Sequence, residues 1–229
     1  MSQPVSRPTV RVLLAITCLL TASACSMLHL KPSPASTDAS VHAAKAIRVA
    51  SANLVTKQGT TEPKVVLSLY EDFLCPICGR FEQQFGPTVN QLIDGGELAA
   101  DYYMVAILDS SRSQNYSSRS GGAAYCVADA DTAPDMATFR RFHAALYAQQ
   151  PSETGSTFPT NTQLAETARQ AGASGDAAQC IEKGRYADLS AGLAAATNVN
   201  STPTVRINGE DYQPSTPDAL AAKVKELVG

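Results

Sequence analysis

Apolar residues between positions 64 and 108 form a continuous run, then recur at helical spacing, and then form a second continuous run. Residues 64–70 are an almost unbroken run of β-branched and apolar side chains, which predicts a strand buried on both faces. The apolar positions that follow are spaced as on one face of a helix, namely Ile77, Phe81, Phe85, Val89 and Leu92. Residues 102–108 form another apolar run and predict a second buried strand. Strand, helix and strand in this order predict a right-handed parallel unit.

A long helical pattern occupies residues 117–198, where alanine is frequent and short stretches of Gly, Pro and Ser interrupt the pattern. These interruptions divide it into four predicted helices, at residues 120–131, 133–150, 163–172 and 176–198.

The end of the chain returns to a strand pattern at residues 204–207, followed by the turn Asn208–Gly209 and a second short run at 210–212. Asn-Gly between two short strands is a strong signal for a two-residue hairpin. A final helix is predicted after it, with Thr216 as its cap and Pro217 at its first position.

The first 24 residues have the pattern of a secretory signal peptide. Arg7 and Arg11 precede an apolar run at residues 12–20, and small residues continue up to Cys25. Three interpretations stay open. The first is a lipoprotein signal, cleaved before Cys25 with lipid attached to its sulfur. The others are an ordinary signal peptide with a soluble product, and an uncleaved anchor over residues 12–30, which is just long enough to span a bilayer.

We favour a cell-membrane-attached lipoprotein of a bacterial cell envelope, although Ala22 stands where lipoprotein signals prefer leucine. All three interpretations place the rest of the chain outside the cytoplasm. Residues 25–61 are rich in Ala, Ser, Pro and Thr without periodicity, which predicts a flexible tether. Within it, residues 47–49 fit a short edge strand, and the folded domain is expected over residues 62–229.

Composition argues against a nucleic-acid partner. The formal net charge is −3 and there is no tryptophan. Proteins that bind nucleic acid typically carry a basic excess, or aromatic residues interleaved with Lys and Arg.

Six cysteines occur, at positions 18, 25, 75, 78, 126 and 180. Two of them fall within the signal segment and at its end, which leaves four in the folded domain. A zinc site at Cys75 and Cys78 would need two further Cys or His ligands at close spacing. His42 lies in the tether and His143 in a helical pattern, so we expect no metal and no cofactor.

Cys75 stands where the first strand ends and the helix begins. Unpaired amide donors and the positive end of the helix dipole stabilise an anion there, which lowers the pKa of the thiol. Pro76 suits the first helical position because its missing donor would be unpaired in any case. Cys78 follows one turn later and can resolve a mixed disulfide. We interpret the pair as redox-active; the alternatives are a purely structural disulfide and half of a metal site.

Residues 70–78 (YEDFLCPIC) and 201–209 (STPTVRING) resemble the DsbA-like members of the thioredoxin superfamily. The resemblance spans about residues 65–229. It implies an α/β, thioredoxin-like fold with a helical insertion at about residues 112–199, and thiol:disulfide oxidoreductase activity. The partners it implies are reduced exported proteins as substrates and a membrane oxidase of the DsbB or VKOR type that regenerates the disulfide.

Thr202 and Pro203 resemble the cis-proline loop of that family, which lies against the active-site disulfide and binds substrate. A cis bond presents the backbone of the preceding residue for short pairing with an extended substrate. An ordinary trans proline at the start of a strand is the alternative, since most X–Pro bonds are trans.

The chain departs from the best-known oxidants of the family at two positions. Ile77 replaces a histidine between the cysteines, so one hydrogen-bond donor near the thiolate is missing. Leu69 occupies the strand position where those oxidants carry a buried acid, which leaves proton transfer to water or to nearby groups. We expect Glu71 and Asp72 to be solvated or close to the helix, and we assign them no catalytic role.

Cys126 and Cys180 both lie in the long helical pattern. An exported protein with an even number of cysteines favours a structural disulfide that joins the first inserted helix to the last. Two buried free thiols and a second redox pair are the alternatives.

The function we expect is that of an exported oxidase, which forms disulfides in extracytoplasmic proteins through Cys75 and Cys78. A reductase or isomerase uses the same chemistry in another direction. A binding or chaperone module anchored by lipid is a different class, but binding alone needs neither sulfur. Isomerases usually dimerise through an extra domain, which the tether leaves no room for, so oxidation is favoured.

Overall fold

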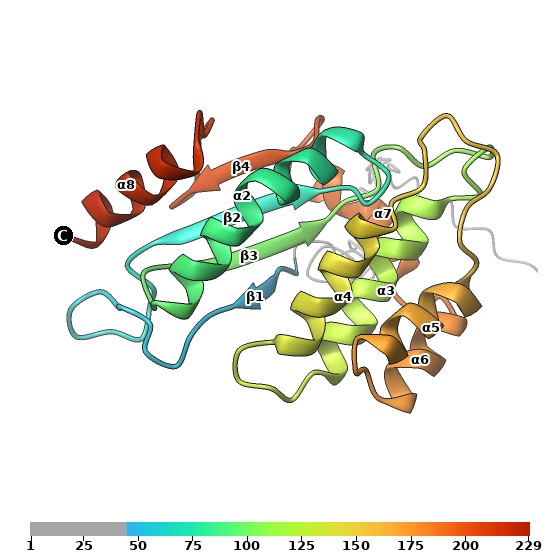
Figure 1. Cartoon of the computed structure of the whole chain (residues 1–229), viewed down its shortest axis with the longest axis horizontal. Coiled ribbons are helices and arrows are strands. Elements are labelled where there is room, and N and C mark those ends of the chain that lie inside the picture. The colour runs from blue at the N-terminus through green and yellow to red at the C-terminus, as the bar shows by residue number, and fades with distance from the viewer. Residues whose placement is uncertain (1–44) are drawn as a thin grey trace, which may run out of the picture. The chain divides into compact units, whose positions relative to one another are not determined.

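A computed structural model describes residues 45–229, and these residues form one mixed α/β unit (Figure 1). The predicted signal peptide at residues 1–24 and the predicted lipidation site, Cys25, lie outside the described residues. The elements are β1 (Ile47–Val49), β2 (Val66–Glu71), α2 (Pro76–Asp94), β3 (Ala99–Met104), α3 (Tyr116–Ala130), α4 (Ala137–Ala148), α5 (Asn161–Gln170), α6 (Gly175–Glu182), α7 (Ala187–Ala196), β4 (Thr204–Ile207), β5 (Glu210–Asp211) and α8 (Pro217–Val228).

The sheet has five strands in the order β1-β3-β2-β4-β5, with β2 at its centre. Strand β2 pairs in parallel with β3, where Leu69 lies opposite Tyr102. On its other side β2 pairs antiparallel with β4, where Leu69 lies opposite Val205. The apolar run predicted a strand covered on both faces, and both are covered: Leu67 and Leu69 are fully buried on one face, and Tyr70 on the other is 6% exposed.

The second predicted strand lies a few residues earlier than expected, at Ala99–Met104 instead of residues 102–108. Its parallel partner β2 ends at Glu71, which lies opposite Met104, so the ladder has no further partner and the chain leaves the sheet. The predicted hairpin at Asn208–Gly209 is confirmed, because β4 pairs antiparallel with β5 across this turn.

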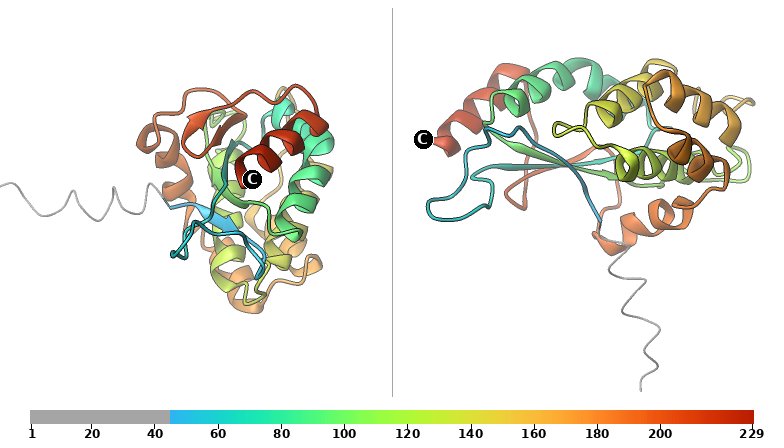
Figure 2. Two further views of the ribbon diagram at one scale, coloured as in Figure 1. Left: turned by 90° about the vertical axis from the view of Figure 1, so that its left-hand side faces the viewer. Right: turned by 90° about the horizontal axis from the view of Figure 1, so that it is seen from below.

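Helices cover the sheet on both faces. Figure 2, right, shows α2 and α8 above the sheet and α7 below it. The buried face of α2 includes Phe81, Phe85 and Val89, as its helical spacing predicts. This layering brings the first turn of α2 to the end of the central strand.

The helical block lies between β3 and β4 and contains five helices, α3 to α7, where the sequence predicted four. The predicted helix at residues 176–198 is in fact two, because the chain turns between α6 and α7. Gly184 has φ +62° there, a conformation that favours glycine and ends a helix. The pattern of apolar residues continues across the turn, which is why it resembled one helix.

The predicted tether is ordered in its last part, and the short edge strand expected at residues 47–49 is confirmed as β1. Strand β1 pairs antiparallel with β3, and Ile47 and Val49 are buried. The backbone N–H of Val55 donates to the carbonyl oxygen of Gly96 at 2.8 Å. Gly96 has φ +71°, and a Cβ there would lie 2.4 Å from the carbonyl oxygen of Asn53. Contacts from distant residues hold this polar segment in place; residues 25–44 of the predicted tether lie outside the described range.

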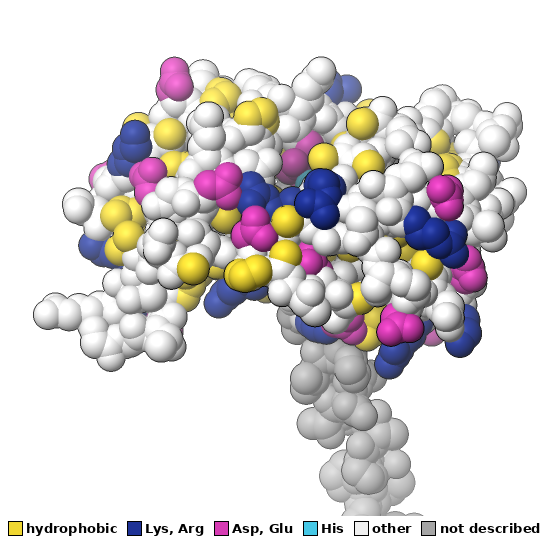
Figure 3. Space-filling view, turned by 60° about the horizontal axis from the view of Figure 1, so that its bottom comes forward, with side chains coloured by type: hydrophobic (Ala, Val, Ile, Leu, Met, Phe, Trp, Pro, Cys, Tyr) yellow, Lys and Arg dark blue, Asp and Glu magenta, His cyan; other side chains and the backbone are white. Residues whose placement is uncertain are grey.

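The surface carries both signs of charge. On the face shown in Figure 3, acidic and basic side chains are interspersed, so this face has no extended field of one sign. Within residues 45–229, none of the helices combines the length and the apolar character of a membrane span.

Candidate active site

Cys75 is the N-cap residue of α2, directly after the loop that leaves β2, and Pro76 occupies the first turn. The backbone N–H of Gly79 donates to the carbonyl oxygen of Cys75 at 3.2 Å, which begins the helix. Both cysteines of the pair are free thiols. Cys78 is fully buried, whereas 6% of Cys75 is exposed. Cys75 is therefore the sulfur that a substrate can reach.

The two sulfurs have opposite acidities. A hydrogen bond from the Cys78 thiol, supported by Thr202 and by the backbone N–H groups of Ile77 and Cys78, lowers the pKa of Cys75 to about 5 against the effect of burial. Burial raises the pKa of Cys78 far above its usual range, and the neighbouring charge of Glu71 adds to this effect. At neutral pH, Cys75 is a thiolate and Cys78 a thiol.

Thr202 and Pro203 lie beside this pair, and the peptide bond between them is cis. Sγ of Cys75 lies 3.4 Å from the carbonyl oxygen of Thr202, to which it donates a hydrogen bond when it is protonated. The sequence segments around residues 75 and 203 thus meet at one end of the sheet, although 127 residues separate Cys75 from Thr202.

Ile77 lies in the first turn of α2 and is 54% exposed, unusually high for a large apolar side chain. It offers an apolar surface to a partner but no hydrogen bond to either sulfur. The position between the cysteines thus contributes nothing to the stabilisation of the Cys75 thiolate through its side chain.

Glu71 and Asp72 are completely buried, which corrects the expectation that they are solvated. The carboxylate of Asp72 accepts hydrogen bonds from the backbone N–H groups of Leu74 at 2.8 Å and Leu108 at 2.9 Å. These bonds fix the loop that carries Cys75. Burial raises the pKa of Asp72 to about 6. In the sequence, two adjacent acids after a strand resemble a polar turn. Their burial could not be read from this pattern, because the groups that bury them come from distant segments.

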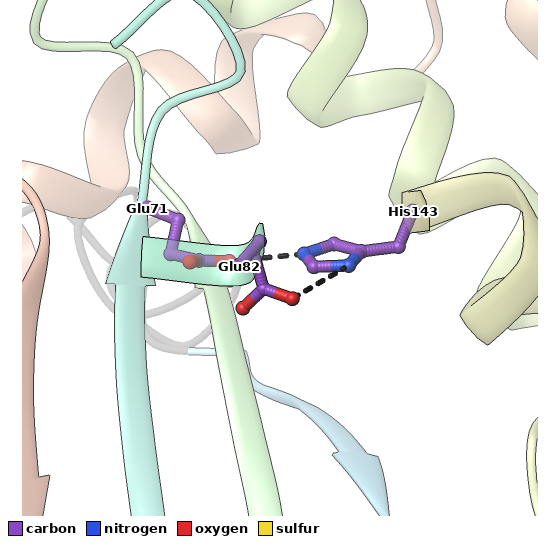
Figure 4. Close-up of side chains that lie close together, drawn as sticks. All are labelled: Glu71, Glu82 and His143. Carbon is purple, nitrogen blue, oxygen red and sulfur yellow. Dashed lines mark hydrogen bonds and ion pairs between the residues drawn. The ribbon is translucent and has the colours of Figure 1, made fainter. Parts of the chain in front are cut away.

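Glu71 contacts a histidine from the helical block (Figure 4). Its Oε2 lies 2.9 Å from Nε2 of His143 on α4, and Nδ1 of the same ring lies 3.8 Å from Oε2 of Glu82 on α2. Burial raises the pKa of Glu71 and of Glu82 to about 8, and it lowers the pKa of His143. Sequence reasoning missed this cluster, because His143 sits among the apolar positions of its helix.

Glu71, Glu82 and His143 are also the residues within the described chain that could hold a metal ion, since one ligand atom of each lies within 4.8 Å of the others. However, His143 faces the two acids with different ring nitrogens. One ion binds one nitrogen of an imidazole, so the arrangement suits a chain of hydrogen bonds better than a metal centre. The sequence expectation of no metal stays a prediction.

Cys126 and Cys180 form a disulfide with a Cα–Cα distance of 5.7 Å. It joins α3 to α6 and not to the last inserted helix, because the predicted last helix is divided into α6 and α7.

A family model described as thioredoxin matches residues 53–226. Two solved structures from Mycobacterium tuberculosis are similar over most of their length. DsbG, a disulfide bond oxidoreductase, is 57% identical with a TM-score of 0.77, covering 80% of this chain and 88% of that one. Reduced DsbA is 56% identical with a TM-score of 0.77, covering 81% and 93%.

More distant matches show the fold alone. MdbA of Corynebacterium diphtheriae, a thiol-disulfide oxidoreductase, is 22% identical with a TM-score of 0.61, covering 79% of this chain and 88% of that one. Among curated proteins, the serine/threonine-protein kinase PknE of M. tuberculosis is 31% identical over 147 residues, which is 63% of this chain. This chain spans about a quarter of the length of the curated relatives it matches. With a cysteine pair at the start of α2, a thioredoxin-like sheet and a helical insertion, the chain belongs to the thioredoxin family and is a thiol–disulfide oxidoreductase of the DsbA type.

Proposed function

We propose that this protein is an exported oxidase, which transfers the Cys75–Cys78 disulfide to reduced proteins outside the cytoplasm. The observation that supports this direction best is the pKa of Cys75, which its surroundings lower to about 5. Stabilising the thiolate stabilises the reduced form of the enzyme, and a couple whose reduced form is stabilised is a better oxidant.

The reaction proceeds in two exchanges. A substrate thiolate attacks Sγ of Cys75 in the oxidised enzyme, the bond to Cys78 breaks, and Cys78 takes up a proton. A second substrate thiolate then attacks the substrate sulfur of the mixed disulfide. The substrate disulfide forms and Cys75 leaves as a thiolate, which its surroundings already stabilise. Two electrons pass from the substrate to the enzyme.

Thr202 and Pro203 are proposed to bind the substrate. The proposal is supported by the contact between the carbonyl oxygen of Thr202 and Sγ of Cys75 at 3.4 Å. An extended substrate could pair with the backbone at this point. Exposed Ile77, two residues after Cys75 in the first turn of α2, would contribute an apolar contact to the substrate.

Export is proposed from the signal-peptide pattern of residues 1–24, and attachment to the membrane from Cys25. An oxidase that works repeatedly must be re-oxidised. The partner we propose for this step is a membrane oxidase of the DsbB or VKOR type, which accepts the two electrons from Cys75 and Cys78.

The experiment follows thiols on both molecules. The oxidised protein is mixed with a peptide that carries two reduced cysteines, and thiol labelling is read by mass. We expect the peptide to gain a disulfide while Cys75 and Cys78 become labelled. If the peptide remains reduced while the protein keeps its disulfide, and the reduced protein instead opens a peptide disulfide, the enzyme is a reductase.

A matched pair of variants tests the roles of the two sulfurs. In a glutathione buffer that contains glutathione disulfide, Cys78→Ser should accumulate a mixed disulfide with the peptide, because nothing resolves it. Cys75→Ser should be inert, because its remaining thiol is buried and has a raised pKa. If only Cys75→Ser traps the peptide, the roles are reversed.

A further inference from the structure

Disulfide exchange leaves a proton problem at the buried sulfur. When a substrate attacks Cys75, Cys78 is released as a thiolate at a site that is fully buried. Burial raises its pKa strongly, so it needs a proton before the enzyme can settle in its reduced form. Water has no direct access to Cys78, so a side chain must deliver this proton.

Glu71 is placed to do so. It is fully buried at the end of β2, directly before Asp72, whose backbone carbonyl oxygen accepts a hydrogen bond from the N–H of Cys75 at 2.9 Å. This places Glu71 at the turn that carries the cysteine pair, and its charge adds to the raised pKa of Cys78. Its Oε1 has no hydrogen-bond partner among the described residues, while its Oε2 contacts Nε2 of His143. A carboxyl that delivers a proton must be recharged, and Glu71 itself has no contact with solvent.

His143 and Glu82 connect Glu71 to the surface. Nδ1 of His143 faces Oε2 of Glu82 at 3.8 Å. Glu82 lines a cavity of about 760 Å³ between α2 and α4, together with Arg80, Gln83 and Asn90. The separation of 3.8 Å exceeds a direct hydrogen bond, and the cavity beside it admits water that can bridge the two groups. Figure 4 shows the imidazole reaching the two acids from the opposite side.

We propose that His143 relays a proton from Glu82, at the cavity, to Glu71, beside Cys78, each time the disulfide is opened. The inference rests on the proposed redox function and adds a route for its proton. His143 touches neither substrate nor sulfur, so it is a relay residue that acts through Glu71. No motif around the cysteines contains it, because it comes from the inserted helical block.

Protons and electrons are conserved in this transfer. The S–S bond breaks, its electron pair stays on Cys78, and Glu71 gives its proton to that sulfur. Nε2 of His143 then returns a proton to Glu71, while Nδ1 takes one from the carboxyl of Glu82. Glu82 is recharged from water in the cavity. One of the two protons of the substrate dithiol thereby ends on Cys78, and the other is released to solvent.

The surroundings of the relay keep its acids protonated near neutral pH. Burial, with the like charge of the other acid, raises the pKa of Glu82 to about 8. The titratable and charged groups around the cluster come from every element packed against it: Asp72 after β2, Cys75 and Cys78 at the start of α2, Tyr102 on β3, and Arg140 and Tyr147 on α4. The pKa values of Tyr102, Arg140 and Tyr147 are all raised, so these three groups keep their protons near neutral pH and do not compete with the acids as proton donors.

The test is the rate at which the oxidised protein oxidises a dithiol peptide in a single turnover. His143→Gln keeps a polar side chain of similar size but cannot carry a proton through a ring. We expect the rate at pH 6.5 to fall about a hundredfold, the lower end of what positioned proton transfer contributes. The difference from wild type should shrink above about pH 9, where Glu71 and Glu82 have lost their protons. A purely structural defect would lower the rate equally at every pH.

Two further variants make the result specific. His143→Ala leaves space beside the cavity, and millimolar imidazole should restore part of its rate. Asp101→Asn is the matched control, because Asp101 is another buried acid of the sheet but pairs with Arg48 on β1. Its rate per folded molecule should equal that of wild type.

A wild-type rate and pH profile in His143→Gln would contradict the relay, because the proton would then pass directly between Glu71 and Glu82. The relay is also wrong if imidazole restores no activity to His143→Ala. These outcomes differ from failure of the proposed function. In that case wild type itself would leave the peptide reduced.

Discussion

Gln150 is hydrogen-bonded to Cys75: its side-chain amide donates to the backbone carbonyl oxygen of Cys75 at 2.9 Å. The same nitrogen donates to the carbonyl oxygen of Phe73 at 3.0 Å. Gln150 follows α4, so the helical block holds the active-site turn through these two bonds. The insertion is therefore part of the support of the site as well as a cover over it.

Gln150→Ala should lower the free energy of unfolding by about 1–3 kcal/mol, because it leaves two buried carbonyl groups without their donor. Urea denaturation of the oxidised protein measures the change. Gln149→Ala is the matched control: Gln149 precedes it, is exposed, and should change stability little. Equal losses in the two variants would assign the effect to the end of the helix and not to the bonds.

The reduction potential should lie between those of thioredoxin, about −270 mV, and DsbA, about −120 mV. The helix start stabilises the Cys75 thiolate, but Ile77 provides no donor, and about 30 mV corresponds to about 1.4 kcal/mol. Ile77→His should make the couple more oxidising by several tens of millivolts and lower the pKa of Cys75 further. Equilibration with glutathione measures both proteins. A wild-type value at or below that of thioredoxin would contradict the proposed oxidase and favour a reductase.

The reactivity of Cys75 should depend on pH with a midpoint of about 5, and should be nearly constant from pH 7 upward. Alkylation of the reduced protein, with the thiolate followed by its ultraviolet absorbance, measures this. The lowered pKa also affects stability. An unfolded cysteine titrates near about 8.5, so the thiolate stabilises the fold fully above that pH, and the contribution is lost as pH falls through about 5. Relative to Cys75→Ser, the reduced protein should thus gain stability between pH 5 and 8.5.

Replacing both Cys126 and Cys180 by serine should lower thermal stability without changing turnover per folded molecule. The bridge closes a loop with a sequence separation of 54, for which the entropy model gives about 4 kcal/mol at most. Thermal unfolding and the dithiol-peptide assay measure the two properties on the same sample. A fully folded double variant that has lost activity would show that the bridge supports the site or takes part in the reaction.

Much of the sheet could be predicted because local patterns determine it. The apolar run of β2, the helical spacing in α2 and the Asn208–Gly209 turn each indicate their element without knowledge of the rest. The placement of Cys75 at a helix start followed from the same patterns, since it lies between a strand and a helix.

What could not be predicted depends on distant contacts. Nothing in the order Glu71–Asp72 shows that both acids are buried, because one of the groups that cover Glu71 is His143, 72 residues later. The ordered structure of residues 45–61 likewise depends on Gly96, because its lack of a side chain lets the backbone of Asn53 approach. In both cases a polar segment is fixed by a partner that periodicity does not reveal.

The place of β2 in the sheet affects how the chain folds. Its neighbour β4 lies far along the sequence, for Tyr70 pairs with Thr204. During synthesis the central strand therefore has one edge unpaired until β4, at residues 204–207, has emerged, and pairing over such sequence distances is slow. An exposed central strand beside reactive thiols is a hazard for aggregation and for wrong disulfides. A protein with this topology must avoid aggregation and wrong disulfides until the β4–β5 hairpin has been synthesised and has paired with β2.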